Sequence, residues 1–150
     1  MAEATRWGYF DTSVLVKRYV REPGSARARA LLRRYGFLSS AVAPVELLSA
    51  LQRRWATGEL APASFEAIRT RIGRDRAHWA LVEVTSAVLD RAEWVIDHTG
   101  VRTLDAIHLA SAWHARATAG APQSRIPFVT ADLPQRVAAL RLGLDVHWVG

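Results

Sequence analysis

The sequence predicts a single α/β domain over residues 1–150, in which a mostly parallel sheet is covered by helices on both faces. Short apolar runs of strand length alternate with longer segments whose apolar residues recur at helical spacing. Such alternation is typical of parallel sheets, whose strands are joined by helical crossovers. No repeat, low-complexity tract or linker interrupts the pattern, and 150 residues can bury a hydrophobic core without disulfides.

The first strand and the first helix are expected near the start of the chain. Trp7–Phe10 is an apolar run short enough for a buried strand, and it ends at Asp11. Thr12 or Ser13 is expected to cap the helix that follows, because hydroxyl oxygens accept hydrogen bonds from the free N–H groups of a helix start. The helix should end near residues 23–24, a Pro-Gly pair.

The next segments predict a helix, a short strand and then two helices joined by a turn. The helix is expected over residues 25–35 and the strand over residues 37–39. Pro44 suits the first turn of the following helix, where its missing N–H costs nothing. The Thr-Gly pair at 57–58 should end that helix, and apolar residues at helical spacing predict its partner over 65–79.

A strand and two capped helices are expected in the following segment. The strand covers residues 81–84, and Ser86 is expected to cap a helix that continues through Ile96. Thr103 is expected to cap the next helix, over residues 104–117. The spacing of strand and helix continues the alternation of the first half.

The C-terminal segment predicts two strands around a short helix. Residues 126–130 form an apolar run typical of a buried strand, and Asp132 is expected to cap the helix after it. Gly143 should end this helix, and residues 146–149 should close the sheet as an edge strand.

Four acidic residues stand at the ends of these predicted elements. Asp11 and Asp132 directly follow strands, whereas Glu46 and Asp105 fall in first helical turns. Ligands of open parallel sheets bind outside the carboxyl ends of the strands, so we expect the four carboxylates to converge there. Each acid taken alone has a simpler interpretation, because acidic residues at helix starts also serve the helix dipole or a cap.

Convergent carboxylates repel one another unless a cation lies between them. Oxygen ligands without cysteine select Mg²⁺, or alternatively Mn²⁺. Two such ions can activate a water and stabilise the leaving oxygen of a phosphodiester. The four acids therefore predict a metal-dependent phosphodiester hydrolase.

The composition restricts the classes of binding partner and the cellular compartment that we expect for this protein. The net charge is +6, and 19 of the 20 basic residues are arginine, which suits a polyanion such as RNA or, alternatively, a generally basic surface. The absence of cysteine excludes disulfides, thiolate zinc sites and thiol nucleophiles. No signal peptide and no membrane-spanning run are apparent, so a cytoplasmic protein without membrane contact is expected.

Other acid-rich or phosphate-binding α/β folds fit poorly. Receiver domains and aspartyl-phosphate phosphatases need a lysine late in the fold, whereas Lys17 is the only lysine and lies in the first helix. The phosphatases also need a second Asp where Ser13 stands. No G-x-S-x-G, P-loop or G-x-G-x-x-G motif supports a serine hydrolase or a nucleotide-binding fold.

Three stretches resemble the PIN-domain family and, within it, the VapC-type toxins of bacterial toxin–antitoxin pairs. They are the opening Tyr9–Tyr19 with Glu22–Gly24, the central Arg102–Ala112, and the closing Phe128–Asp132 with Leu142–Leu144. The resemblance implies a three-layer α/β/α PIN-like domain with strand order 3-2-1-4-5. It also implies a Mg²⁺-dependent endoribonuclease that forms a homodimer and is inhibited by a cognate antitoxin protein.

The resemblance also implies roles for individual residues. Asp11, Glu46 and Asp105 match the family's main acidic positions, and Asp132 matches its more variable fourth acid. All four are candidate catalytic residues and metal ligands, with Asp11 and Asp105 on a first metal. The supporting hydroxyls are those of Thr12, Ser13 and Thr130. Leu133 and Pro134 replace the polar or basic residues that often follow the fourth acid.

Several other side chains keep two interpretations. His108 shares a helix face with Asp105 and is either a proton carrier or, more simply, a structural histidine bonded to a neighbouring loop. Arg102 either contacts a substrate phosphate or neutralises the acids. Arginines on the predicted helical pair, Arg53 and Arg54 among them, form an RNA track or a solvated face. Aromatic residues of this pair, Trp55, Phe65 and Trp79, are expected in its core or at a dimer interface.

Two alternative functions remain at this point. One is a DNA-directed or structure-specific nuclease with the same metals, since no residue distinguishes RNA from DNA without the resemblance. The other is a non-catalytic module that binds RNA through its basic surface. The complete set of four acids argues against the second.

Overall fold

Five short apolar runs become the strands of the central sheet in this computed structural model, which describes residues 5–119 and 125–150. The strands are β1 (Trp7–Phe10), β2 (Gly36–Ser40), β3 (Ala80–Val82), β4 (Phe128–Thr130) and β5 (Val146–Trp148). The helices are α1 (Thr12–Tyr19), α2 (Ser25–Arg34), α3 (Ala43–Ala56), α4 (Pro62–Asp75), α5 (Ser86–Thr99), α6 (Thr103–Thr118) and α7 (Leu133–Arg141), and a 3-10 turn, η1 (Arg76–His78), follows α4.

The strand order is β3-β2-β1-β4-β5, and the four pairings between neighbours are parallel. The predicted α/β class and the order 3-2-1-4-5 are therefore confirmed. β1 lies at the centre and pairs with both β2 and β4. Because all the described strands run the same way, their carboxyl ends meet at one edge of the sheet.

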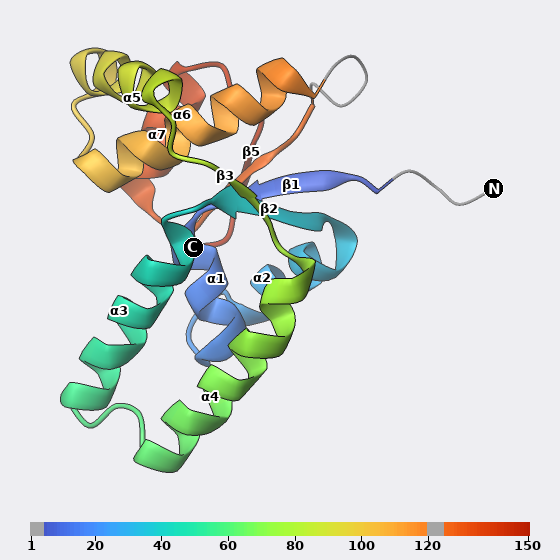
Figure 1. Ribbon diagram of the computed structural model, residues 1–150, viewed down its shortest axis with the longest axis vertical. Helices are drawn as coiled ribbons and strands as arrows, with labels where there is room; N and C mark the ends of the chain where they lie inside the picture. The colour runs from blue at the N-terminus through green and yellow to red at the C-terminus, as the bar shows by residue number, and fades with distance from the viewer. Residues whose placement is uncertain (1–4, 120–124) are drawn as a thin grey trace.

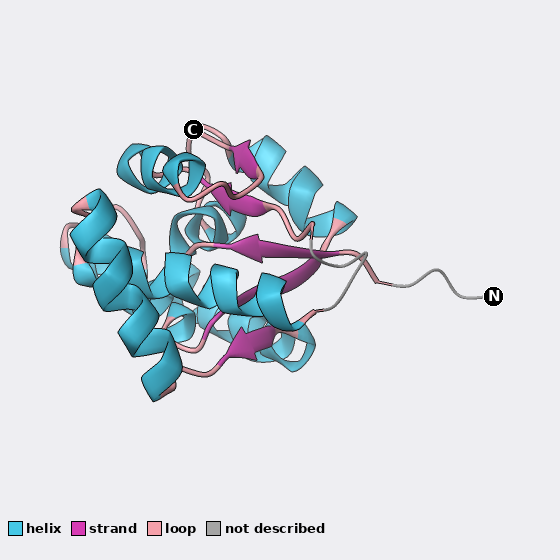
Figure 2. Ribbon diagram, turned by 90° about the horizontal axis from the view of Figure 1, so that it is seen from above, coloured by secondary structure: helices cyan, strands magenta, loops and turns pink. Residues whose placement is uncertain are grey.

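Helices cover both faces of the sheet, as Figures 1 and 2 show, with α1–α4 on one side and α5–α7 on the other. Successive residues of a strand point to opposite faces, so β1 supplies aromatic rings to both layers. Phe10 packs with Leu15 and Leu47 on the α1–α4 side. Tyr9 packs with Leu109 on the α5–α7 side. All of these side chains are fully buried, as is expected of a strand covered on both faces.

The α3–α4 pair extends away from the sheet in Figure 1. Phe65 is buried in the core on the α1–α4 side, and half-exposed Trp55 stacks at an angle against it, with ring centroids 5.8 Å apart. The predicted helix over 65–79 is wrong at its C-terminal end, because α4 stops at Asp75. Trp79 follows η1 and packs on Phe37 instead, with ring centroids 5.2 Å apart.

Three strands are shorter than predicted, and one of them, β5, ends at Trp148 rather than at residue 149. Backbone pairing begins at Phe128 rather than at residue 126, and Pro127, which has no N–H to donate, contributes only its carbonyl to Tyr9 N at 2.8 Å. The strand predicted over 81–84 is Ala80–Val82, so its last two residues lie beyond the ladder.

The predicted caps of three helices are wrong by one residue, whereas that of α7 is confirmed. Asp11 caps α1 in place of Thr12 or Ser13, and Thr85 caps α5 in place of Ser86. Helix α6 begins at Thr103 after Arg102, without a side-chain cap. A capping residue needs extended backbone dihedrals. Asp11, Thr85 and Arg102 have them, whereas the residues predicted as caps already belong to the helices.

Candidate functional site

The structure places the four predicted acids at the carboxyl edge of the sheet. Asp11 ends β1 and Asp132 follows β4, while Glu46 and Asp105 lie in the first turns of α3 and α6. Burial raises the pKa of Asp105, and the negative charges of Asp132, Asp11 and Glu46 raise it further. Carboxylates from distant segments of the sequence are thus close enough to affect the pKa of Asp105.

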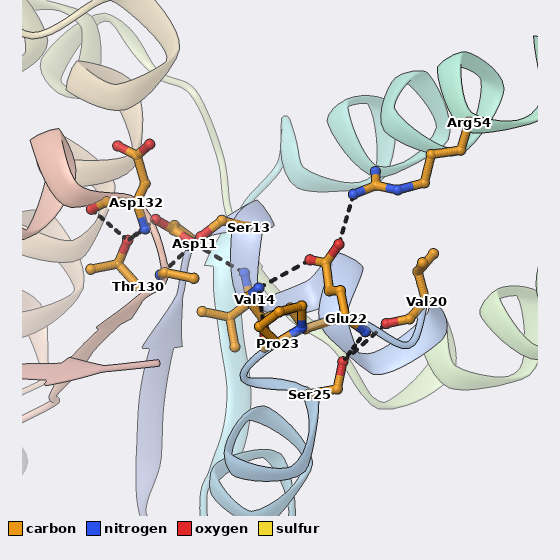
Figure 3. Close-up of polar contacts among 12 residues, drawn as sticks. Asp11, Ser13, Val14, Val20, Glu22, Pro23, Ser25, Arg54, Thr130 and Asp132 are labelled. Carbon is orange, nitrogen blue, oxygen red and sulfur yellow. Dashed lines mark hydrogen bonds and ion pairs between the residues drawn. The ribbon is translucent and has the colours of Figure 1, made fainter. Parts of the chain in front are cut away.

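Asp11 is the most buried of the four acids, with 2% of its surface exposed. Ser13 Oγ and Thr130 Oγ1 each donate a hydrogen bond to one of its carboxylate oxygens, and the backbone N–H of Val14 donates at 3.4 Å (Figure 3). Burial raises its pKa, although the hydrogen bonds from these donors counteract the rise. The cap of α1 is therefore also an acid at the sheet edge.

Hydroxyl groups connect the loop after β4 to Asp11. Thr130 Oγ1 donates to Asp11 and accepts from the N–H of Asp132 at 3.0 Å, while Ser13 Oγ accepts from the N–H of Ala131 at 3.0 Å. Two of the three predicted hydroxyls therefore lie on Asp11. The third, Thr12, instead donates to Glu46 Oε1 at 2.9 Å.

Gln135 is a residue of this site that the sequence analysis missed. It is 2% exposed, and its Nε2 donates to Asp105 Oδ1 at 3.3 Å, while its backbone N–H donates to the capping carboxylate of Asp132 at 3.0 Å. A signal was present, because Asp132 and Gln135 have capping-box spacing. The side chain is not used for that box, since the N–H of Asp132 is bonded to Thr130.

His108 lies next to Glu46 and is 1% exposed. Its Nε2 is 2.6 Å from Glu46 Oε1 and 3.1 Å from Thr12 Oγ1, and its Nδ1 is 2.9 Å from the hydroxyl of Tyr9. Tyr9 is also fully buried, which raises its pKa well above the ordinary value. His108 therefore bonds to three secondary-structure elements rather than to a loop, and its burial leaves it no access to solvent.

The acids suit a divalent cation because each of three carboxylates keeps one oxygen free. Within residues 5–119 and 125–150, no protein group donates to Glu46 Oε2, Asp105 Oδ2 or Asp132 Oδ1. In the same residues no arginine or lysine forms an ion pair with any of the four acids.

The geometry favours an ion held only in part by protein. No three Asp, Glu, His or Cys side chains of the described segments enclose a single metal position. Mg²⁺ commonly takes one or two carboxylates and completes its octahedron with waters and substrate phosphates. The free carboxylate oxygens match that requirement.

A cavity of about 720 Å³ opens beside Asp105 and Asp132. Its wall includes Arg102 before α6 and Arg141 at the end of α7, both exposed, together with apolar residues of α7 such as Leu133 and Val137. In the described part of the chain neither arginine has an ion-pair partner. The cavity therefore combines acidic and basic groups on a partly apolar surface.

The two arginines predicted on α3 differ in environment. Arg53 is exposed and donates to Ser49 of its own helix at 2.9 Å. Arg54 pairs with Glu22 at 2.9 Å, and Glu22 also pairs with Lys17 at 3.1 Å. Figure 3 shows Arg54 reaching Glu22, away from Asp11. Arg54 thus connects α3 to the turn between α1 and α2.

Comparisons with known proteins agree with this architecture. The family model described as PIN domain matches residues 8–138. Ribonuclease VapC46 from Mycobacterium tuberculosis is 37% identical over 139 residues, which are 92% of this chain and 94% of that protein.

No helix among the described residues has the length and apolar character needed to cross a membrane.

Two solved structures are similar in fold. FitAcB from Neisseria gonorrhoeae has a TM-score of 0.62 at 16% identity, over 92% of this chain and 94% of that one. A toxin-antitoxin complex from Klebsiella pneumoniae has a TM-score of 0.56 at 14% identity, over 83% of this chain and 86% of that one. At these identities the similarity concerns the fold.

Proposed function

The chain belongs to the PIN-domain family and to its VapC-type branch, and from this premise we propose that it is a metal-dependent endoribonuclease, the toxin of a toxin–antitoxin pair. The observation that carries the proposal is the set of acids at the sheet edge, three of which keep an oxygen free of donors from residues 5–119 and 125–150. The activity named for the M. tuberculosis relative supports RNA as the substrate.

In this proposal Asp11, Asp105, Asp132 and Glu46 are the candidate ligands of Mg²⁺, with Mn²⁺ as a substitute, and one or two of them bind each ion together with waters and substrate phosphates. When bound, the ion lowers the pKa of a water and offsets the charge that develops on the phosphate. Ser13 and Thr130 keep Asp11 oriented through their hydrogen bonds to it, and Gln135 keeps Asp105 oriented. Orientation by neighbours matters because a misplaced carboxylate loses both affinity and rate.

The cavity beside Asp105 and Asp132 supplies a route for the RNA strand. Arg102 and Arg141 are free to contact phosphates on its wall, and guanidinium groups match phosphate oxygens in two parallel hydrogen bonds. Leu133 and Val137 offer apolar contact to a sugar or a base. Arg53 is a further candidate contact, whereas Arg54 is engaged by Glu22.

The proposed partners are a cognate antitoxin and a second copy of the chain. Exposed apolar residues recur on one face of α7, where Leu133, Val137 and Leu140 follow helical spacing. Such contiguous apolar surface is typical of protein–protein contact. The proposed RNA substrate and antitoxin support a location in the cytoplasm.

The test is cleavage of defined single-stranded RNA and of matched DNA, with Mg²⁺, Mn²⁺ or excess EDTA. We expect RNA to be cut only with metal, and Asp11→Asn to abolish cutting while the fold survives in circular dichroism. Arg33→Ala, at an exposed position on α2, is the matched control and should cut RNA as wild type does. Cleavage in EDTA would refute the metal mechanism, and preference for DNA would favour the alternative nuclease of the same fold.

A further inference from the structure

A chain of buried hydrogen bonds runs from the centre of the sheet to one of the acids. Tyr9 on β1 contacts His108 on α6 at 2.9 Å, and His108 contacts Glu46 on α3 at 2.6 Å. Thr12 on α1 contacts both Glu46 Oε1 at 2.9 Å and His108 Nε2 at 3.1 Å. Glu46 is therefore held, directly or through His108, from three other elements, although its own side chain is partly exposed.

The partners of the imidazole define which of its nitrogens carries the proton. An ionised carboxylate accepts hydrogen bonds and cannot donate them, so the 2.6 Å contact with Glu46 requires a proton on Nε2. In a neutral imidazole Nδ1 then has no proton and accepts from the hydroxyl of Tyr9. Thr12 donates to Glu46 and receives part of the Nε2–H.

Such an arrangement is not needed for packing alone. Apolar residues in place of both His108 and Tyr9 would fill the space without the cost of burying polar atoms, and replacement of both partners by apolar groups of similar shape is often nearly neutral. What the imidazole adds is control over Glu46: both protein donors bind Oε1, and within the described residues Oε2 has none. Helix α6 carries Asp105 one turn before His108, so one helix orients two of the acids.

We propose that His108 is a positioning residue, whose Nε2–H fixes Glu46 Oε1 and leaves Oε2 free for the divalent cation, while Tyr9 fixes the tautomer. This inference rests on the proposed function. It assigns His108 no contact with the RNA and no proton transfer. Three groups outside the acid set, His108, Tyr9 and Thr12, thereby belong to the metal site through Glu46.

The test compares His108→Leu, His108→Gln and Tyr9→Phe with wild type. Glutamine places an N–H₂ near the position of Nε2, so it restores the bond to Glu46, whereas leucine restores only the volume. His114→Gln, at an exposed position further along α6, is the matched control. Mn²⁺ affinity is measured without RNA by the paramagnetic resonance of free Mn²⁺, folding by thermal melts in EDTA, and the tautomer by ¹⁵N NMR.

We expect His108→Leu to bind Mn²⁺ about 10–100-fold more weakly, the usual cost of removing a group that orients a ligand. It should also melt below wild type, because the buried hydroxyl of Tyr9 loses its partner. His108→Gln should recover most of the affinity, and Tyr9→Phe should fall between the two. Wild-type NMR should show the Nε2–H tautomer.

Wild-type Mn²⁺ affinity in a folded His108→Leu protein, or an Nδ1–H tautomer in wild type, would overturn the inference. If His108→Leu does not fold, the affinities of His108→Gln and Tyr9→Phe and the tautomer decide. Mn²⁺ binding without RNA cleavage in wild type would refute the proposed function alone, and no Mn²⁺ binding at all would refute both.

Discussion

Asp105 shows how a site acid affects the stability of the whole chain. Burial and the charges of Asp132, Asp11 and Glu46 raise its pKa, so its ionised form strains the fold at neutral pH. A cation that binds only the native site stabilises it by RT ln(1 + [L]/Kd), about 2.7 kcal/mol when the ligand is at 100 Kd. The acid cluster should therefore be visible in melting temperatures.

We predict that Asp105→Asn in EDTA melts at or above the wild-type temperature, because it removes one of several like charges. Addition of Mg²⁺ should raise the wild-type melting temperature by several degrees and that of the variant much less. Differential scanning calorimetry in EDTA and at increasing Mg²⁺ measures both effects. If Asp105 served only the dipole of α6, the variant would instead lose about 0.3–1 kcal/mol in EDTA and Mg²⁺ would change neither protein.

Some residues of the candidate site could be predicted from the sequence and others could not. The four acids could be identified because each stands at the end of an element, and the local pattern of apolar residues predicts where elements end. The role of Gln135 could not be predicted, because its amide bonds to Asp105, 30 positions away. Its spacing from Asp132 indicates a capping box instead.

At the scale of elements, α4 is tied to α1 by a compact polar cluster. Asp75 at the end of α4 accepts from Arg18 Nε at 3.1 Å and from the hydroxyl of Tyr19 at 2.5 Å. Partial burial opposes ionisation of Asp75, but these two donors and the positive charge of Arg18 outweigh it and lower its pKa. The α3–α4 pair is thereby anchored at its C-terminal end as well as through buried Phe65.

We predict that Asp75→Asn lowers the free energy of unfolding near neutral pH by about 1 kcal/mol, the order expected of a partly exposed charged hydrogen bond. Because the pKa of Asp75 is lowered on folding, its contribution is complete above the ordinary value of about 3.9 and is lost as pH falls through the folded value. The gap between wild type and variant should therefore close in acid.

Urea denaturation from about pH 7 down to about pH 3 tests this prediction, because that range spans the ordinary pKa of an aspartate. Asp97→Asn on exposed α5 is the control and should track wild type at every pH. A gap between wild type and Asp75→Asn that stays constant with pH would mean that the carboxylate charge contributes nothing.

At the scale of the whole molecule, a net charge of +6 favours binding to a polyanion. The distribution of charge decides which arginines take part. Arg102 and Arg141 lie on the cavity that also contains Asp105 and Asp132, whereas Arg54 is paired with Glu22. Replacement of Arg54 should therefore affect stability more than RNA binding.

We predict that Arg102→Ala and Arg141→Ala each flatten the dependence of log K on log salt for single-stranded RNA, by about 0.7 for every phosphate that the variant no longer neutralises. Binding is measured by fluorescence anisotropy with a catalytically inactive Asp11→Asn background at several salt concentrations. Arg33→Ala on α2 changes the net charge equally and should leave the slope unchanged. Equal slopes in all variants would remove the cavity from the RNA path.

Local sequence patterns were enough to predict the α/β class and the candidate acids at the ends of their elements, and the family resemblance predicted the strand order. These features depend on neighbours in the chain: apolar spacing selects strand or helix, and a parallel sheet brings its carboxyl ends to one edge. The errors were local too, since Asp11 and Thr85 took the caps that were assigned to residues just after them.

The groups that orient the acids could be identified from the folded chain but not from the sequence. His108 and Glu46 are 62 positions apart and Thr130 and Asp11 are 119 apart, so no local pattern pairs them. A hydroxyl, an imidazole or an amide has several possible partners in a sequence, and burial selects among them because a buried polar group without a partner is costly. Thr12 and Thr130 carry the same hydroxyl group, yet Thr12 donates to Glu46 and Thr130 donates to Asp11. Contacts between distant segments, rather than residue type, therefore decide which acid each hydroxyl orients.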